Sequence, residues 1–122
     1  MQRVRGVGGI FFKSRGNRRA LLDWYQAHLG IDFEAEWGGR VFRDLAAESE
    51  GLTWSIFKHD TTYFGGGDFM INYKVDDLDA MLAQLREAGV EVDGHVEESE
   101  YGRFGWAVDP EGNRFELWEA PA

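Results

Sequence analysis

The chain has 122 residues, the size of one ordinary domain, and its composition excludes several classes of protein. Hydrophobic residues make up 43% of it and aromatic residues 15%, which is too much apolar content for a disordered chain. The net charge of −9 argues against nonspecific nucleic-acid binding. A membrane-spanning helix needs about twenty consecutive apolar residues, and no apolar stretch approaches that length. The absence of cysteine excludes disulfides and thiolate metal sites. Because the apolar run before Lys13 is too short for a signal peptide, we expect a cytoplasmic protein with neither nucleic acid nor membrane as partner.

The charge is distributed unevenly along the sequence. The first 19 residues contain six basic side chains and no acidic one, so the other 103 residues carry a formal charge of −15. The six basic residues are Arg3, Arg5, Lys13, Arg15, Arg18 and Arg19. One hypothesis is that Arg15, Arg18 and Arg19 receive a ligand's phosphate or carboxylate, or the acidic surface of a second subunit. The alternative is that they pair with the chain's own carboxylates.

The first half of the chain is predicted to form a strand, a helix and further strands. Residues 10–13 form the first strand. The following helix is predicted by apolar residues at helical spacing: Leu21, Leu22, Tyr25 and Leu29. Gly30 supplies a left-handed stop for this helix. Further strands are expected at 41–43 and 52–57.

The second half repeats this order. A strand at 70–75 leads into a helix whose apolar residues are Leu78, Met81, Leu82 and Leu85. Gly89 ends that helix, and strands are expected at 104–108 and 113–118. Between these strands, residues 109–112 read Asp-Pro-Glu-Gly, which is the residue order of a type I turn.

A shift of 61 residues superposes the two halves. It places 9–13 on 70–74 and 51–57 on 112–118. The glycines that stop the helices differ by 59, so the first copy has two extra residues near Gly16 and Asn17. A shared offset on both sides of a small insertion indicates an internal repeat.

The repeat predicts one domain, residues 1–122, built from two modules. The modules cover about 4–58 and 69–119, and the glycine-rich segment 59–68 is expected to be a flexible linker.

Short segments in both modules carry a resemblance to a known family. They are Leu22-Asp23-Trp24-Tyr25, His28-Leu29-Gly30, Val75-Asp76-Asp77-Leu78, Asp109-Pro110-Glu111-Gly112-Asn113 and Phe115-Glu116-Leu117-Trp118. With the repeat, they resemble the vicinal oxygen chelate superfamily, which includes glyoxalase I, bleomycin-resistance proteins and extradiol dioxygenases. The resemblance implies an α+β fold in which two tandem βαβββ modules form a half-open eight-stranded cup with the helices outside. It also implies a homodimer.

Enzymes of this superfamily hold a divalent metal with His and Glu side chains from the first and last strands of each module. The resemblance places these positions at Gly9, Ser55, Met70 and Glu116, so three of the four lack a good ligand. The three histidines, His28, His59 and His95, form no metal-binding pair and are expected at the surface. We therefore expect no metal and no other cofactor, with a divalent ion only if an atypical site exists.

Strand alternation predicts which side chains would line the cup. The candidate ligand-binding residues are Phe11, Lys13, Met70, Asn72, Lys74, Arg114 and Trp118. Glu116 is the single catalytic candidate, as a general base, and the alternative is a structural carboxylate neutralised by nearby cations. Trp37, Trp54, Trp106 and Trp118 suggest an aromatic cage or, alternatively, core packing. The repeat pairs Trp54 with Phe115, so Trp54 is expected to face a helix.

These observations favour a glyoxalase- and bleomycin-resistance-like protein that binds a small organic molecule in an aromatic cup without a catalytic metal. One alternative is a metal-dependent or Glu116-based lyase, epimerase or dioxygenase of the same superfamily. Another is a protein whose pocket has lost its ligand and which serves as an interaction partner.

Overall fold

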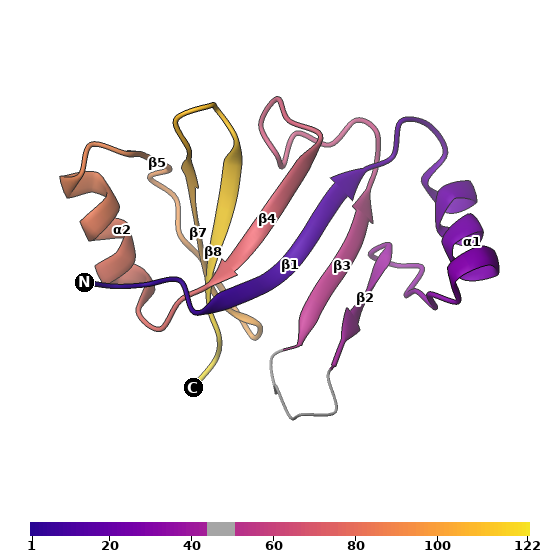
Figure 1. The fold of residues 1–122 in the computed structure, drawn as a ribbon, viewed down its shortest axis with the longest axis horizontal. Coiled ribbons are helices and arrows are strands. Elements are labelled where there is room, and N and C mark those ends of the chain that lie inside the picture. The colour runs from indigo at the N-terminus through magenta and orange to yellow at the C-terminus, as the bar shows by residue number, and fades with distance from the viewer. Residues whose placement is uncertain (44–50) are drawn as a thin grey trace. The chain divides into compact units, whose positions relative to one another are not determined.

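The computed structural model describes residues 1–43 and 51–122, and within them the chain forms two helices and eight strands (Figure 1). In chain order these are β1 (Gly6–Lys13), α1 (Arg18–Leu29), β2 (Gly39–Phe42), β3 (Leu52–Phe57), β4 (Phe69–Lys74), α2 (Leu78–Glu87), β5 (Glu91–Val92), β6 (Glu97–Ser99), β7 (Gly102–Val108) and β8 (Arg114–Glu119). The predicted α+β class is confirmed. Neither helix of the described chain is long and apolar enough to cross a membrane.

The chain divides into two compact units. The first unit is Gly9–Phe69, and the second unit is Met1–Gly8 together with Met70–Ala122. Strand β1 contributes to both, because its first three residues belong to the second unit and the rest to the first.

In the first unit, β3 lies between β2 and β1. It runs parallel to β1, with Phe11 opposite Ser55, and antiparallel to β2, with Gly39 opposite Ser55. Helix α1 packs on this sheet through Tyr25, whose ring centroid is 5.2 Å from that of Trp54, so Trp54 faces a helix as predicted. Within the described residues two strands follow α1, and a single bridge between Glu34 and Gly39 precedes them.

In the second unit, β8 lies between β4 and β7. It runs parallel to β4, with Asn72 opposite Glu116, and antiparallel to β7, with Trp106 opposite Glu116. Strands β5 and β6 both pair with β7. One face of β4 and β8 packs on α2. The buried cluster there is formed by Val75, Leu78, Met81, Leu82 and Leu117.

The parallel strand pairs of the two units share one register. Phe11 lies opposite Ser55 in the first unit, and Asn72 lies opposite Glu116 in the second. Both partners differ by the same 61 residues, as the sequence repeat requires. The repeat in the sequence is therefore also a repeat in strand pairing.

The ends of both helices follow from local sequence. The Asn17 side chain caps α1 by accepting from Ala20 N, and the Asp77 side chain caps α2 by accepting from Ala80 N. Gly30 ends α1 with φ of +67°, the left-handed conformation that favours glycine. In α2 the capping residue is Ala88, and Gly89 follows in the left-handed region.

The turn at 109–112 and the glycine-rich segment 59–68 are the two connections for which the sequence predicted a conformation. Residues 109–112 form the expected turn, in which Gly112 N donates to Asp109 O at 3.0 Å. Segment 59–68 packs on the first unit through Phe64, which is 1% exposed and whose ring centroid lies 4.7 Å from that of Phe57. The prediction of a flexible linker missed this packing, which glycine content alone does not reveal.

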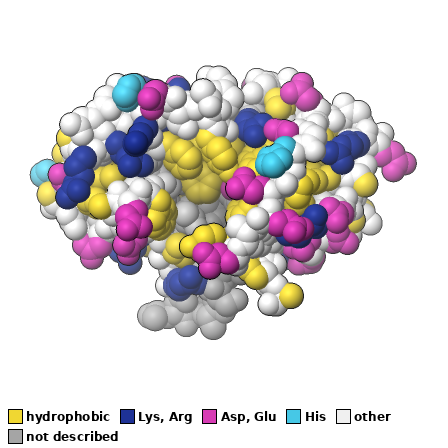
Figure 2. All heavy atoms as spheres, turned by 180° about the vertical axis from the view of Figure 1, so that it is seen from behind, with side chains coloured by type: hydrophobic (Ala, Val, Ile, Leu, Met, Phe, Trp, Pro, Cys, Tyr) yellow, Lys and Arg dark blue, Asp and Glu magenta, His cyan; other side chains and the backbone are white. Residues whose placement is uncertain are grey.

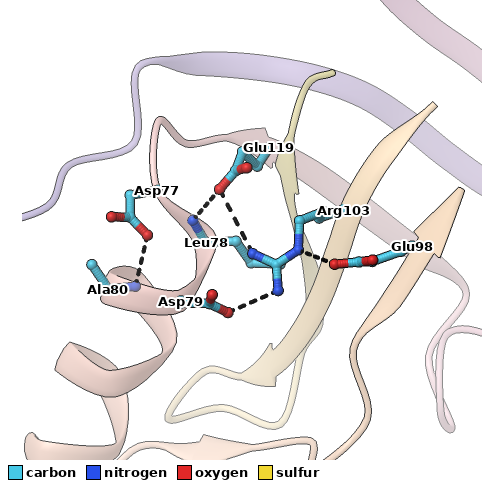
Figure 3. A network of polar contacts seen from close by, with 7 residues as sticks. All are labelled: Asp77, Leu78, Asp79, Ala80, Glu98, Arg103 and Glu119. Atoms are coloured by element: carbon cyan, nitrogen blue, oxygen red, sulfur yellow. Dashed lines mark hydrogen bonds and ion pairs between the residues drawn. The ribbon is translucent and has the colours of Figure 1, made fainter. Parts of the chain in front are cut away.

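Arg103 on β7 joins three segments of the second unit (Figure 3). Its guanidinium contacts Asp79 in the first turn of α2 at 2.9 Å, Glu98 on β6 at 2.7 Å and Glu119 on β8 at 4.0 Å. Glu119 also accepts from Leu78 N at 2.8 Å. The hydrogen bond from Arg103 lowers the pKa of Asp79 below its ordinary value, and the two carboxylates, Asp79 first, raise the pKa of Arg103.

Candidate functional site

The candidate site in the second unit is centred on the Glu116 carboxylate. Asn72 Nδ2 donates to Glu116 Oε1 at 2.6 Å, and Trp106 Nε1 donates to Oε2 at 3.0 Å. The arrangement follows from strand register, because Asn72 and Trp106 are the residues opposite Glu116 on the two neighbouring strands. All three are at most 3% exposed. We call these three residues the Glu116 row.

Burial of a carboxylate is costly unless hydrogen bonds replace its hydration. Here each carboxylate oxygen accepts a hydrogen bond from a neutral N–H donor, and these donors stabilise the charged form. The two hydrogen bonds fix the position of the Glu116 carboxylate. The Glu116 row is therefore a buried carboxylate held by protein donors from both neighbouring strands.

Asn72 adds a second acceptor to this row. Its Oδ1 is the one buried side-chain polar atom of the described residues that has no hydrogen-bond partner. A Cβ placed on Gly8 would overlap this oxygen and would lie 2.9 Å from Cε3 of Trp118. Gly8 is therefore required for β1 to pass this close to the Glu116 row.

Aromatic and charged side chains cover the Trp106 end of the row. The Arg114 guanidinium lies 5.4 Å from the Trp106 ring centroid, and the His95 ring stacks on the same indole at 5.9 Å. Asp93 accepts from Arg114 at 3.2 Å and from His95 N at 2.9 Å. These bonds, the one from His95 N first, lower the pKa of the Asp93 carboxyl. His95 is exposed, as predicted, but it is in contact with the site.

The predicted lining residues of the second unit lie on the expected strands. Met70, Asn72 and Lys74 are all at most 3% exposed, while the alternate residues Tyr73 and Val75 belong to the core under α2. Trp118 stacks at 6.3 Å on Phe104, and its Nε1 donates to Tyr101 O at 2.7 Å. The alternation used to choose these residues is therefore correct, and their role in ligand binding stays a prediction.

Two predicted lining residues lie in the first unit. Phe11 is 8% exposed, with its ring 5.6 Å from that of Phe57. Lys13 Nζ lies 3.5 Å from Asp68. Neither belongs to the Glu116 row.

Sequence reasoning did not single out Trp106 as the partner of Glu116. A signal was present, because the turn at 109–112 closes a hairpin in which Val108 lies opposite Arg114. Counting two residues along each strand from that pair places Trp106 opposite Glu116.

The four family metal positions do not fit a catalytic metal. Gly9 offers no side chain, and a Cβ there would lie 2.7 Å from the Phe11 ring. Ser55 Oγ donates to the carbonyl oxygen of Trp37 at 3.2 Å, and Met70 offers only a thioether, a poor ligand for hard divalent ions. Within residues 1–43 and 51–122 no group of three His, Cys, Asp or Glu side chains could hold a metal ion.

Comparison with known protein families identifies the family of this chain. The sequence profile of the glyoxalase-like domain matches residues 10–118. The chain belongs to this family. Membership agrees with the resemblance to the vicinal oxygen chelate superfamily seen in the sequence. No curated protein matches the chain significantly.

Several solved structures share the fold. Methylmalonyl-CoA epimerase from Mycobacterium tuberculosis is 20% identical, with a TM-score of 0.64 over 98% of this chain and 90% of that one. A variant of the Streptomyces coelicolor epimerase, in complex with 2-nitronate-propionyl-CoA, is 19% identical, with a TM-score of 0.69 over 98% and 100%. A Legionella pneumophila chain described as NAD-dependent benzaldehyde dehydrogenase is 13% identical, with a TM-score of 0.62 over 93% and 98%. At these identities the similarity shows the fold alone.

Proposed function

We propose that this glyoxalase-like protein binds a small organic molecule at the Glu116 row without a catalytic metal. The observation that carries the proposal is a buried carboxylate whose two oxygens are held by Asn72 and Trp106. Both oxygens of this carboxylate thus already accept hydrogen bonds from protein N–H groups.

The chemistry of the row indicates the class of ligand. Glu116 and Asn72 Oδ1 are both acceptors, so they favour a molecule that carries N–H or O–H donors. Replacing buried charges with apolar residues is often neutral or stabilising, so stability alone does not require Glu116. Met70, Lys74, Arg114 and Trp118 are proposed to line the site.

Titration calorimetry with a panel of aromatic amines and alcohols tests this proposal. Glu116→Gln should weaken binding of the best panel member at least about tenfold, because it replaces one carboxylate acceptor with an amide donor. Glu111→Gln is the matched control, since it removes one exposed negative charge from the same hairpin. Equal affinities of the Glu116→Gln variant and the wild type would refute the proposal.

A second candidate function is epimerisation of a CoA thioester, favoured by the structural similarity to methylmalonyl-CoA epimerases. Glu116 would remove the proton next to the thioester carbonyl, and a water molecule would then deliver a proton to the opposite face of the enolate. Both Glu116 oxygens already accept hydrogen bonds from Asn72 and Trp106, so binding is the primary proposal. Proton NMR of methylmalonyl-CoA in D₂O decides between them: Glu116-dependent loss of the C2 proton signal supports epimerisation.

We also propose that the protein is a cytoplasmic homodimer, as the family resemblance implies. Hydrophobic side chains are exposed among charged ones on the face shown in Figure 2, and such surfaces commonly form subunit contacts. Sedimentation equilibrium measures the oligomeric state directly, and a monomer at micromolar concentration would contradict this proposal.

A further inference from the structure

The first unit contains an open groove of about 690 Å³ between the start of α1 and the segment that precedes β4. Its lining residues are Phe12, Lys13, Ser14, Arg15, Gly16, Asn17, Ala20, Leu21, Trp24, Asp68 and Phe69. We call this the α1 groove. Its volume falls in the range of about 300–1,000 Å³ that is typical of small-molecule sites.

Aromatic side chains form the walls of the α1 groove. Trp24 is 50% exposed and Phe69 is 47% exposed, so both rings present flat apolar surface to solvent. Trp24 is nevertheless held in place, because its ring contacts Tyr25 at 5.2 Å and His28 at 4.9 Å. A fixed, half-exposed indole can stack against a flat ligand at little entropic cost.

The groove also carries positive charge that the protein does not neutralise fully. Arg15 is exposed and has no hydrogen bond or ion pair with any residue in the described ranges. Lys13 Nζ is 3.5 Å from the exposed Asp68 carboxylate, and an ion pair of this kind is weak. The groove therefore offers two cations and one replaceable carboxylate in a chain whose net charge is −9.

The neighbouring arginines of the basic segment are engaged elsewhere. Arg19 forms an ion pair with Asp23 at 3.0 Å, and Arg18 Nη1 donates to Ile56 O at 3.4 Å. Neither lines the α1 groove. Of the basic segment, Lys13 and Arg15 are the residues that line the α1 groove.

The connection that lines the groove differs in length between the two copies of the repeat. Four residues connect β1 to α1, whereas three connect β4 to α2. The longer connection, residues 14–17, lines the α1 groove.

From these observations we infer that the α1 groove binds a flat aromatic carboxylate, which stacks on Trp24 and Phe69 and places its anionic group between Arg15 and Lys13. The ligand carboxylate takes the place of Asp68 beside Lys13. This site lies within the first unit and is independent of the function proposed for the Glu116 row.

Titration of the full-length protein with 1-naphthoate, followed by ¹H–¹⁵N NMR, tests the inference. The amide signals of Arg15, Gly16 and Asn17 and the indole signal of Trp24 should shift together with one dissociation constant. The neutral analogue 1-naphthalenemethanol should bind at least about tenfold more weakly, because it lacks the charge that Arg15 and Lys13 recognise.

Charge variants separate recognition from nonspecific attraction. Arg15→Gln should weaken naphthoate binding about tenfold, whereas Arg3→Gln, an exposed arginine of the same basic segment outside the groove, should leave it unchanged. Asp68→Asn should strengthen binding, since it removes the competing carboxylate. Glu116→Gln should have no effect, which distinguishes this site from the Glu116 row.

Three results would overturn the inference. These are the absence of shifts at Arg15–Asn17 and Trp24 at millimolar naphthoate, equal affinity of the Arg15→Gln variant and the wild type, and equal affinity for the neutral analogue.

Discussion

The two connections that lead into the helices have related strand registers but opposite electrostatics. In the second unit Asp77 caps α2 and Asp79 lies in its first turn, where negative charge stabilises a helix. In the first unit Asn17 caps α1, and the first turn contains Arg18 and Arg19 and no acidic residue. The second copy thus follows the electrostatic rule for a helix start, and the first copy breaks it.

The comparison identifies the start of α1 as the region that departs from the charge pattern favourable to a helix. Around α2, acidic and basic groups are paired in one network through Arg103 (Figure 3). Around α1, Arg19 pairs with the Asp23 carboxylate, as the pairing alternative predicted, whereas Arg18 donates to a backbone carbonyl and not to a carboxylate. Arg15 remains beside an open groove. A rule kept in one copy and broken in the other is a useful indicator of a binding surface.

The largest expected effect is at a buried leucine of α2, compared with an exposed leucine of α1. Leu82 is 2% exposed under α2, so Leu82→Ala should lower the free energy of unfolding by about 2–5 kcal/mol. Leu29→Ala is the control on α1, where Leu29 is 60% exposed and the loss should stay within about 0.5 kcal/mol. Urea denaturation measures both, and equal losses would contradict the comparison.

A smaller effect is expected at the Glu116 row. Trp106→Phe retains an aromatic ring but removes the donor to Glu116 Oε2, which should cost about 1.5–3 kcal/mol. Trp54→Phe is the matched change in the first unit, where the indole contacts Tyr25 and Phe12 through its ring. If chemical denaturation gives the same loss for both variants, the hydrogen bond to Glu116 contributes nothing measurable.

Two glycines provide a third test of the comparison. Gly8→Ala should destabilise the fold by about 1–3 kcal/mol, because the new Cβ overlaps Asn72 Oδ1 and presses on Trp118. Gly16, in the loop of the α1 groove, has open space where a new methyl group would lie, so Gly16→Ala should be neutral or slightly stabilising. Thermal unfolding followed by circular dichroism compares the two, and a stable Gly8→Ala variant would contradict the close approach of β1.

The smallest effect is the pH dependence of the Arg103 network. The hydrogen bond from Arg103 lowers the pKa of Asp79 below its ordinary value of 3.8. A lowered folded-state pKa stabilises the fold at pH values above 3.8, and this stabilisation is lost as the pH falls through the folded-state value. The melting temperature of Asp79→Asn should therefore fall less than that of the wild type as the pH is lowered through this range. Superimposable pH profiles of variant and wild type would show that the pair contributes nothing.

The sequence predicted those parts of the structure that depend on local spacing. The offset of 61 identified the residues that occupy equivalent positions in the two copies, and the glycine after each helix marked its end. Strand alternation separated Met70, Asn72 and Lys74 from the core residues around Val75.

The features that were missed depend on contacts across the chain. Trp106 reaches Glu116 from a neighbouring strand, so its role follows from hairpin register rather than from its own surroundings in the sequence. The α1 groove brings residues 12–24 together with Asp68 and Phe69, which no local pattern connects. Phe64 packs into the first unit although it lies in a glycine-rich segment, because apolar burial outweighs the flexibility of the glycines.

The central claim is that protein N–H donors, rather than a metal ion, hold the Glu116 carboxylate. Metal analysis of the purified protein, after incubation with nickel, zinc, iron and manganese salts and gel filtration, tests it most directly. The wild type and the Glu116→Gln variant should both retain far less than one metal ion per chain. One equivalent of metal in the wild type, lost in the Glu116→Gln variant, would contradict the claim.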